Sequence, residues 1–134
     1  MTSTTNDHAD VRRVIGDWHR AILRGDLEGV VAAHTDDIVM FDVPPPQRGV
    51  RGLADYEATW PPFFEWLSSG ASFEMDELEV VGGDDVAFAW ALLRCGSETE
   101  LRERTDRRLR LTLGLRRIEA RWVIAHEHHS FTNP

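Results

Sequence analysis

The segment GDLEGVVAAHTDDIVMFDVPPPQRGVRGLADY, residues 25–56, contains the signals that decide the fold. Gly25 can end a preceding helix, and Asp26 can cap the helix that follows it at residues 27–34. The apolar run DIVMFDV then predicts a short β-strand that finishes on an acid, Asp42. Three prolines and two glycines separate this acid from the next helical stretch. The segment therefore predicts helix, strand, stiff loop and helix in close succession.

Hydrophobic periodicity extends this pattern on both sides. Apolar residues from Val11 to Ile22 recur at helical spacing and predict an N-terminal helix. Pro61 and Pro62 must break or kink the third helical stretch, because proline lacks a backbone N–H and restricts the residue before it. After Gly70 the period changes to two. This change predicts strands at residues 72–81, 86–95, 106–117 and 122–131.

The element order determines the predicted architecture. Helices come first and a long antiparallel meander follows, which is typical of α+β proteins. We therefore predict a single domain over residues 1–134, with about three N-terminal helices covering one face of a strongly curved antiparallel sheet of roughly four to six strands. Phe73 and Met75 are out of phase with Leu78 and Val80, so a bulge is expected near Glu77.

Composition excludes several classes of function. The net charge of −8 disfavours binding to a phosphate backbone. No run of about 18 apolar residues is present to span a membrane, and the polar N-terminus does not resemble a signal peptide. A single cysteine, Cys95, favours a reducing cytoplasm. All fifteen basic residues are arginine, which we attribute to a GC-rich bacterial genome.

Asp42 has two interpretations. It shares a strand face with Met40, so the apolar helix over residues 53–67 would remove its solvent and raise its pKa. A carboxylate of that kind is a competent general base near neutral pH. Aspartate is also an ordinary turn-former before a proline-rich loop. The local residues alone do not separate a catalytic base from a turn residue.

The tail HEHH offers a second group of polar side chains. His126 and His128 lie on one strand face, and Glu127 and His129 lie on the other. Two histidines need a third ligand to hold a metal, and only His34 and Asp42 are obvious candidates. We predict no tightly bound metal and no cofactor, and expect these histidines to line a pocket or an interface. Motifs of zincins, common nucleotide enzymes and α/β hydrolases are absent.

Aromatic and arginine side chains complete the set of candidates. Most large aromatic residues are expected in the core, but some should line the apolar cavity that forms between helices and a curved sheet. Seven of the fifteen arginines fall within residues 101–117, where most alternate with leucine as on the solvated face of a strand. Arg110 is the arginine we expect to compensate the charge of Asp42.

The pattern in residues 25–56, and the element order around it, resemble the nuclear transport factor 2-like superfamily, specifically its ketosteroid isomerase homologues and SnoaL-like polyketide cyclases. The resemblance extends from the first helix to RWVIAHEHHSF. It implies a cone-shaped α+β barrel, usually dimeric through the outer face of the sheet, with a pocket inside the cone. Asp42 falls where the steroid isomerase keeps its general base, Trp18 where it has an oxyanion-hole tyrosine, and Leu113 or Gly114 where it has a buried acid.

These observations lead to a functional hypothesis and one alternative. The hypothesis is a cofactor-independent isomerase, cyclase, dehydratase or hydrolase, other than a true steroid isomerase, that moves a proton on a small apolar carbonyl compound. The alternative is a non-catalytic ligand-binding or oligomerising domain of the same fold. Asp42 and His126 are the predicted catalytic residues. The predicted substrate-binding residues are Trp18, Tyr56, Trp60, Phe64, Trp90, Arg110 and His128. A homodimer is expected, with neither nucleic acid nor membrane as a partner.

Overall fold

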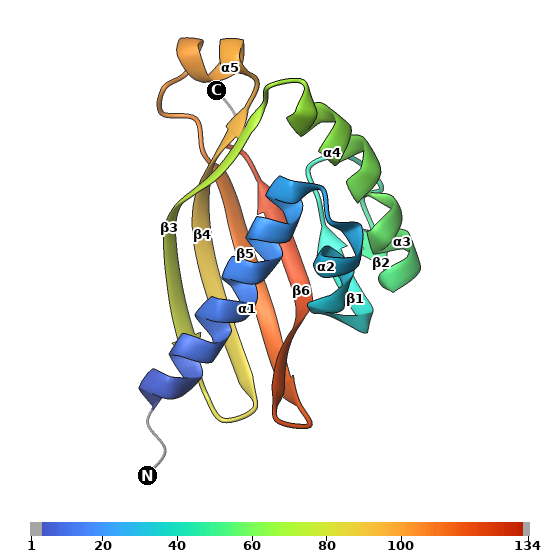
Figure 1. Ribbon diagram of the computed structural model, residues 1–134, viewed down its shortest axis with the longest axis vertical. Coiled ribbons are helices and arrows are strands. Elements are labelled where there is room, and N and C mark those ends of the chain that lie inside the picture. The colour runs from blue at the N-terminus through green and yellow to red at the C-terminus, as the bar shows by residue number, and fades with distance from the viewer. Residues whose placement is uncertain (1–3, 133–134) are drawn as a thin grey trace.

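The computed structural model describes residues 4–132, with side chains from residue 8 onward. The chain is mainly helical before residue 70 and mainly extended after it, as predicted, although a further helix over residues 98–103 lies in the second half (Figure 1). The elements in chain order are α1 (Thr4–Arg24), α2 (Leu27–Ala32), β1 (His34–Phe41), β2 (Val50–Arg51), α3 (Leu53–Ala58), α4 (Trp60–Ser68), β3 (Ser72–Gly82), β4 (Val86–Gly96), α5 (Glu98–Glu103), β5 (Leu109–Ile118) and β6 (Arg121–Ser130).

The local signals of the first half produce the predicted breaks. Gly25 ends α1 with a positive φ of 67°, and Asp26 caps α2 through a hydrogen bond that its Oδ1 accepts from the Gly29 N–H at 3.0 Å. Thr59 separates α3 from α4, and the proline pair sits in the first turn of α4. Proline is tolerated there because the N–H groups of a first turn have no partner within the helix. The predicted third helix is therefore two short helices.

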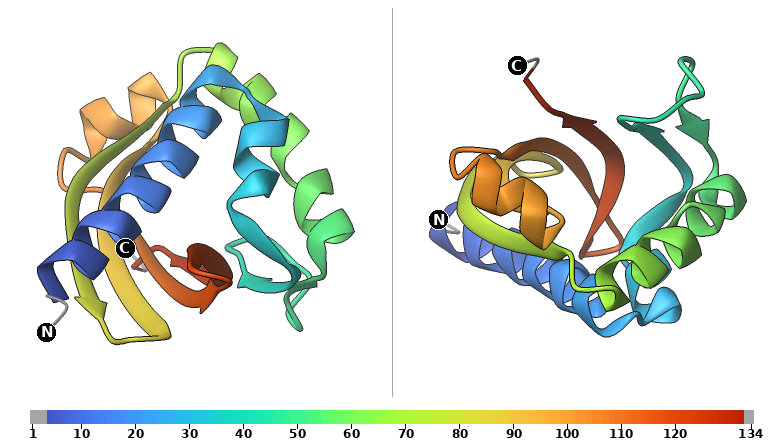
Figure 2. Two further views of the ribbon diagram at one scale, coloured as in Figure 1. Left: turned by 60° about the horizontal axis from the view of Figure 1, so that its bottom comes forward. Right: turned by 90° about the horizontal axis from the view of Figure 1, so that it is seen from above.

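The sheet has six strands in the order β2-β1-β6-β5-β4-β3. All neighbouring strands are antiparallel except β1 and β6, which run parallel. The sheet is strongly curved but does not close into a barrel, and the helices lie against its concave side (Figure 2). The predicted α+β class and the curved sheet are confirmed, with one parallel pair as the exception. The predicted bulge in β3 is also present, between Met75 and Glu77.

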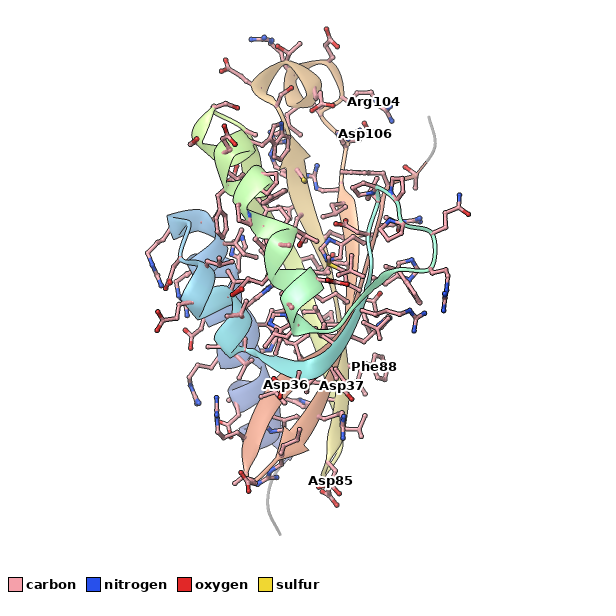
Figure 3. The ribbon with its side chains drawn as sticks, turned by 90° about the vertical axis from the view of Figure 1, so that its right-hand side faces the viewer. Asp36, Asp37, Asp85, Phe88, Arg104 and Asp106 are labelled. Atoms are coloured by element: carbon pink, nitrogen blue, oxygen red, sulfur yellow. The ribbon has the colours of Figure 1, made fainter. Side chains whose placement is uncertain are left out.

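The core lies between α1 and the concave face. α1 buries one stripe of side chains completely, including Ile15, Trp18 and Ile22. Every second residue of β4 and β5 points toward this stripe, from Ala87 to Cys95 and from Leu109 to Leu115. The sequence of β4 is apolar on both faces, which is typical of a strand that is buried on both sides or central in its sheet, but its other face is open. Phe88 and Trp90 are 48% and 42% exposed, on the side of the sheet away from the helices (Figure 3).

Candidate functional site

A cavity of about 490 Å³ opens at the end of the sheet where α4 and α5 lie. The view from above in Figure 2 faces this end. Most of the lining is apolar: Val43, Pro44, Trp60, Pro62, Phe63, Trp66, Phe73, Cys95, Leu109 and Phe131. Its polar lining residues are Asp42, Thr59, Glu100, Arg107 and His129. An apolar cavity with a few convergent polar groups is the usual form of a small-molecule site.

Beside the cavity, one carboxylate organises a buried polar cluster. Glu127 accepts hydrogen bonds at Oε2 from Tyr56 (2.6 Å) and contacts His34 Nε2 there at 2.5 Å. Its Oε1 contacts His129 Nε2 at 2.8 Å. The Tyr56 hydroxyl in turn accepts a hydrogen bond from the Trp18 indole at 3.1 Å. We call these five residues the Glu127 cluster.

The proton positions in this cluster follow from its partners. His34 Nδ1 lies 2.8 Å from the Val30 carbonyl oxygen, which only accepts, so Nδ1 carries a proton. The other ring nitrogen, Nε2, makes the contact with Glu127 Oε2, so the ring is held from both sides. A buried carboxylate with three donors around it is well satisfied, and such networks hold side chains in one arrangement.

The cluster shifts the pKa values of its members. Burial raises the pKa of Glu127, but the hydrogen bonds and charges of His129 and His34 outweigh it and bring the pKa to about 2. Burial lowers the pKa of His129, yet the bond to Glu127 and the charges of Glu127 and Asp42 raise it above 6.5 overall. Burial and Glu127 raise the pKa of Tyr56 well above 10. Glu127 is therefore an anion, and His129 is biased toward the imidazolium.

His129 and Asp42 are the parts of this arrangement that reach the cavity. His129 Nδ1 lies 3.7 Å from Asp42 Oδ1, while Nε2 of the same ring is held by Glu127. The Asp42 side chain is 27% exposed, and its Oδ1 accepts the backbone N–H of Val43 at 2.8 Å. Among the described residues, its Oδ2 has no hydrogen-bond partner. A carboxylate and an imidazole thus face the same apolar space side by side.

A bulge in β6 determines which histidine side chains of this strand point into the protein. Leu115 pairs with Ile124 and Gly114 with His126, so Ala125 is an extra residue in β6. The extra residue shifts the strand by one position. Without it, Ile124 would share its buried face with His126 and His128. With it, the buried face continues through Glu127 and His129.

The predicted roles of His126 and His128 are therefore not supported by their positions. His126 Nδ1 bonds to the Val39 carbonyl oxygen at 2.7 Å, and both rings pack edge-on against Phe41. Neither lines the cavity. Trp90 and Arg110 are also on the outer face, where Arg110 donates to Ser130. Side chains alternate between the two faces of β4 and β5, and those of Trp90 and Arg110 point away from the cavity. Arg110 therefore does not compensate the charge of Asp42.

The remaining predicted substrate-binding residues either line the cavity or lie behind its wall. Trp60 lines the cavity, and its indole N–H lies near the Tyr56 hydroxyl without forming a hydrogen bond of good geometry. Trp18 and Tyr56 are behind the wall, in the Glu127 cluster. Phe64 stacks on Trp60 and lines a second, smaller hollow beside the end of α1. Asp42 and Trp60 are thus the predicted site residues that border the cavity.

Within residues 4–132, the structure contains neither a metal-binding group of side chains nor a membrane-spanning helix. No three histidine, cysteine, aspartate or glutamate side chains in this part of the chain are arranged as metal ligands. In the same range, no helix has the length and apolar character needed to cross a bilayer.

The pKa shifts predict how the free energy of unfolding depends on pH. The depressed pKa of Glu127 gives a contribution that is full above pH 4.5 and is lost as the pH falls toward about 2. The raised pKa of His129 gives a contribution that is full below pH 6.5 and is lost as the pH rises through the shifted value. We expect the cluster to stabilise the fold most between these two limits. Urea unfolding across pH, compared with Glu127→Gln, measures this; parallel curves for the two proteins would contradict it.

Comparison with known proteins agrees with this description. A SnoaL-like domain family model matches residues 11–134, whereas no curated protein matches the chain. An NTF2-like protein of unknown function from Pseudomonas putida is 31% identical, with a TM-score of 0.81 over 94% of this chain and 87% of the other.

Two further solved structures share the fold at lower identity. One is named as a candidate ketosteroid isomerase from Shewanella frigidimarina (19% identity, TM-score 0.71, 88% of this chain and 92% of the other). Another is named as a candidate dehydratase of the NTF2-like family from Streptomyces avermitilis (12% identity, TM-score 0.75, 98% of this chain and 100% of the other). The family match covers nearly the whole described chain, and the resemblance in residues 25–56 is confirmed. The protein belongs to the SnoaL-like domain family of the nuclear transport factor 2-like superfamily.

Proposed function

We propose that this protein is a cofactor-independent enzyme that transfers a proton on a small, largely apolar carbonyl compound bound in the cavity. The observation that carries the proposal is the pair formed by Asp42 and His129. A carboxylate and an imidazole lie 3.7 Å apart at the wall of an apolar cavity, and the imidazole is fixed from behind by Glu127. Enzymes that transfer protons usually hold an acid and a base side by side in a pocket.

Each member of the pair has a distinct role in the proposal. Asp42 takes a proton from the carbon beside the carbonyl, using the carboxylate oxygen that has no protein donor. His129 presents its Nδ1 edge to the same space and donates to the oxyanion that develops on the carbonyl oxygen. Glu127 acts as a positioning residue, because it holds the ring and stabilises its charged form. Asp42 is neutral once it holds the proton, and it becomes a carboxylate again when it returns that proton to another carbon of the substrate or to a leaving group.

The surroundings of Trp18 favour a reaction other than steroid isomerisation. The resemblance places Trp18 at the position of an oxyanion-hole tyrosine, but its indole N–H is already used by Tyr56. Leu113 and Gly114, the two candidates for the position of the second donor, have no side chain that can donate a hydrogen bond. In this proposal His129 of β6 therefore donates the hydrogen bond to the oxyanion, in place of the two positions that the resemblance implies.

Hydrogen–deuterium exchange separates the enzyme from the alternative of a ligand-binding domain. Small apolar ketones and enones are incubated with the protein in deuterated buffer, and NMR follows the loss of the proton beside the carbonyl. The proposal expects exchange above the buffer rate for those compounds that quench tryptophan fluorescence. Compounds that bind throughout the panel without any catalysed exchange would instead support the non-catalytic domain.

We also propose that the protein is a homodimer joined through the outer face of the sheet. Trp90, Thr112, His128 and Phe41 are successive cross-strand neighbours across that face. Phe88 and Trp90 stack with ring centroids 6.0 Å apart, and both remain exposed. A surface that exposes several large apolar side chains on one face of a sheet is typical of a protein interface.

Trp90→Glu is expected to convert the dimer into a folded monomer, because it places a charge in the middle of the proposed interface. Sedimentation equilibrium at micromolar concentration should give twice the chain mass of 15.3 kDa for the wild type and that mass for the variant. The exposed Glu65, on α4, supplies the control Glu65→Gln, which should leave the dimer intact. A monomeric wild-type protein would refute the interface.

The cysteine supports a reducing compartment. Cys95 is a buried free thiol in the cavity wall, and burial raises its pKa to about 11. A thiol of that kind stays protonated and unreactive. A single cysteine without a disulfide partner is usual in a reducing compartment, and on that ground we propose the cytoplasm as the location of the protein.

A further inference from the structure

Arg107 is a cavity residue that the proposed proton transfer does not use. Its guanidinium lies 4.0 Å above the ring of Phe131, and its Nε donates to the Cys95 carbonyl oxygen at 3.1 Å. These two contacts fix the plane of the guanidinium between the ends of β4 and β6. A guanidinium held in one orientation loses little freedom when it binds a planar anion.

The charge of Arg107 is only weakly compensated by the acid nearest to it. Glu100 Oε2 lies 3.9 Å from Arg107 Nη2, which is beyond hydrogen-bond distance. The other oxygen of Glu100 accepts the Ser97 backbone N–H at 2.8 Å in the cap of α5. The Arg107 side chain is 25% exposed, so a charge pair formed there is screened less than one on the open surface. Asp42 is the other acid in the lining, and it lies beside His129.

The register of β5 and β6 gives the order of these groups from the mouth inward. His129 pairs with Leu111, and Phe131 follows two residues later toward the end of the chain. Two residues of extended chain span about 6.6 Å. Arg107 covers the ring of Phe131, so its guanidinium and the His129 ring are about two residues of extended chain apart along β6. Aromatic walls occupy the space between the two levels.

We propose that the ligand of this cavity is an aromatic or polycyclic acid, whose carboxylate binds Arg107 at the mouth while its apolar body reaches inward toward His129 and Asp42. This inference names the substrate class of the proposed enzyme, and it rests on the proposed function only for what happens at the inner end. The spacing implies a carboxylate about one ring away from the reacting carbon. Arg107 thus selects the length and charge of the substrate, whereas Asp42 and His129 carry out the proton transfer.

The test compares two probes of the same shape, 2-naphthoate and 2-naphthalenemethanol, by isothermal titration calorimetry at fixed ionic strength. The wild type should bind the acid about tenfold or more tightly than the alcohol, as expected for a charge-assisted pair. Arg107→Gln should abolish the preference and leave the affinity for the alcohol within about twofold. Arg102→Gln is the matched control, because Arg102 is an exposed arginine of α5 that pairs with Glu98 outside the cavity lining, and the preference should survive there.

Several results would overturn the inference. For the wild type, these are equal binding of the two probes and failure of the acid to bind at millimolar concentration. For Arg107→Gln, they are a preference for the acid that survives and an equal loss of affinity for both probes. If Arg107→Gln does not fold, the salt dependence of the wild type decides: the preference should fall as salt rises, and a constant preference contradicts the inference. Asp42→Asn should retain the preference, so a failed proton transfer and a failed carboxylate site are distinguished.

Discussion

Replacing Glu127 with leucine is expected to lower the free energy of unfolding by about 3–5 kcal/mol. Leucine occupies a similar volume, but it leaves His34, Tyr56 and His129 without the acceptor they share. A buried polar group without a partner costs about 1–3 kcal/mol, and three groups lose theirs together. The costs do not simply add, because the groups belong to one network. Urea denaturation at pH 6 measures the change.

Two further variants show whether the effect comes from the network. In Glu127→Gln the amide oxygen can accept from His129 and the amide nitrogen can donate to His34, so only Tyr56 loses its acceptor and the cost should be about 1–3 kcal/mol. Glu65→Leu replaces an exposed glutamate of α4 and should change stability by no more than about 0.5 kcal/mol. A leucine variant at position 127 as stable as the wild type would mean that the cluster does not hold the site together.

The fold could be predicted because its decisive signals are local. Gly25 and Asp26 end one helix and begin the next, and the proline pair at residues 61–62 interrupts the third helical stretch. Alternation along residues 109–115 places every leucine inside and every intervening residue outside or at the edge. Each of these signals acts within a few residues of its effect, so no knowledge of distant neighbours is needed.

The site could be predicted only in part because it depends on strand pairing. The tail HEHH has two possible faces, and the pattern of the four residues does not say which one is buried. The extra residue at Ala125 sets the phase, and it becomes visible only when β6 is paired with β5. Glu127, His129 and their partner His34 were therefore not assigned to the site, although the buried pair Trp122 and Ile124 marks the start of the inward face.

Other elements were missed although a local signal was present. Ser97 and Glu100 form a capping box, in which each side chain bonds to the other residue's backbone N–H, and this motif begins α5. The polar sequence of residues 96–104, between two predicted strands, favours a loop, and the helix is a correction to that interpretation. Because α5 follows β4 directly, its cap brings Glu100 to the cavity mouth beside Arg107.

Asp42→Asn is expected to reduce catalysed proton transfer by about 10²-fold or more. Asparagine keeps the size of the side chain and its carbonyl oxygen can still accept the Val43 N–H, so the loop after β1 should retain its conformation. What it loses is the carboxylate that accepts a proton. Ligand affinity and the free energy of unfolding should change little, because Asp42 is part of the wall and lies outside the buried cluster.

The rate of deuterium exchange at the carbon beside the carbonyl of a saturating ligand tests this claim most directly. Asp106→Asn is the matched control, since it makes the same change in an exposed residue at the same end of the molecule, outside the cavity lining (Figure 3). We predict that the Asp42→Asn rate falls at least about a hundredfold while the Asp106→Asn rate equals that of the wild type. An Asp42→Asn protein that binds the ligand and exchanges its proton at the wild-type rate would contradict the account.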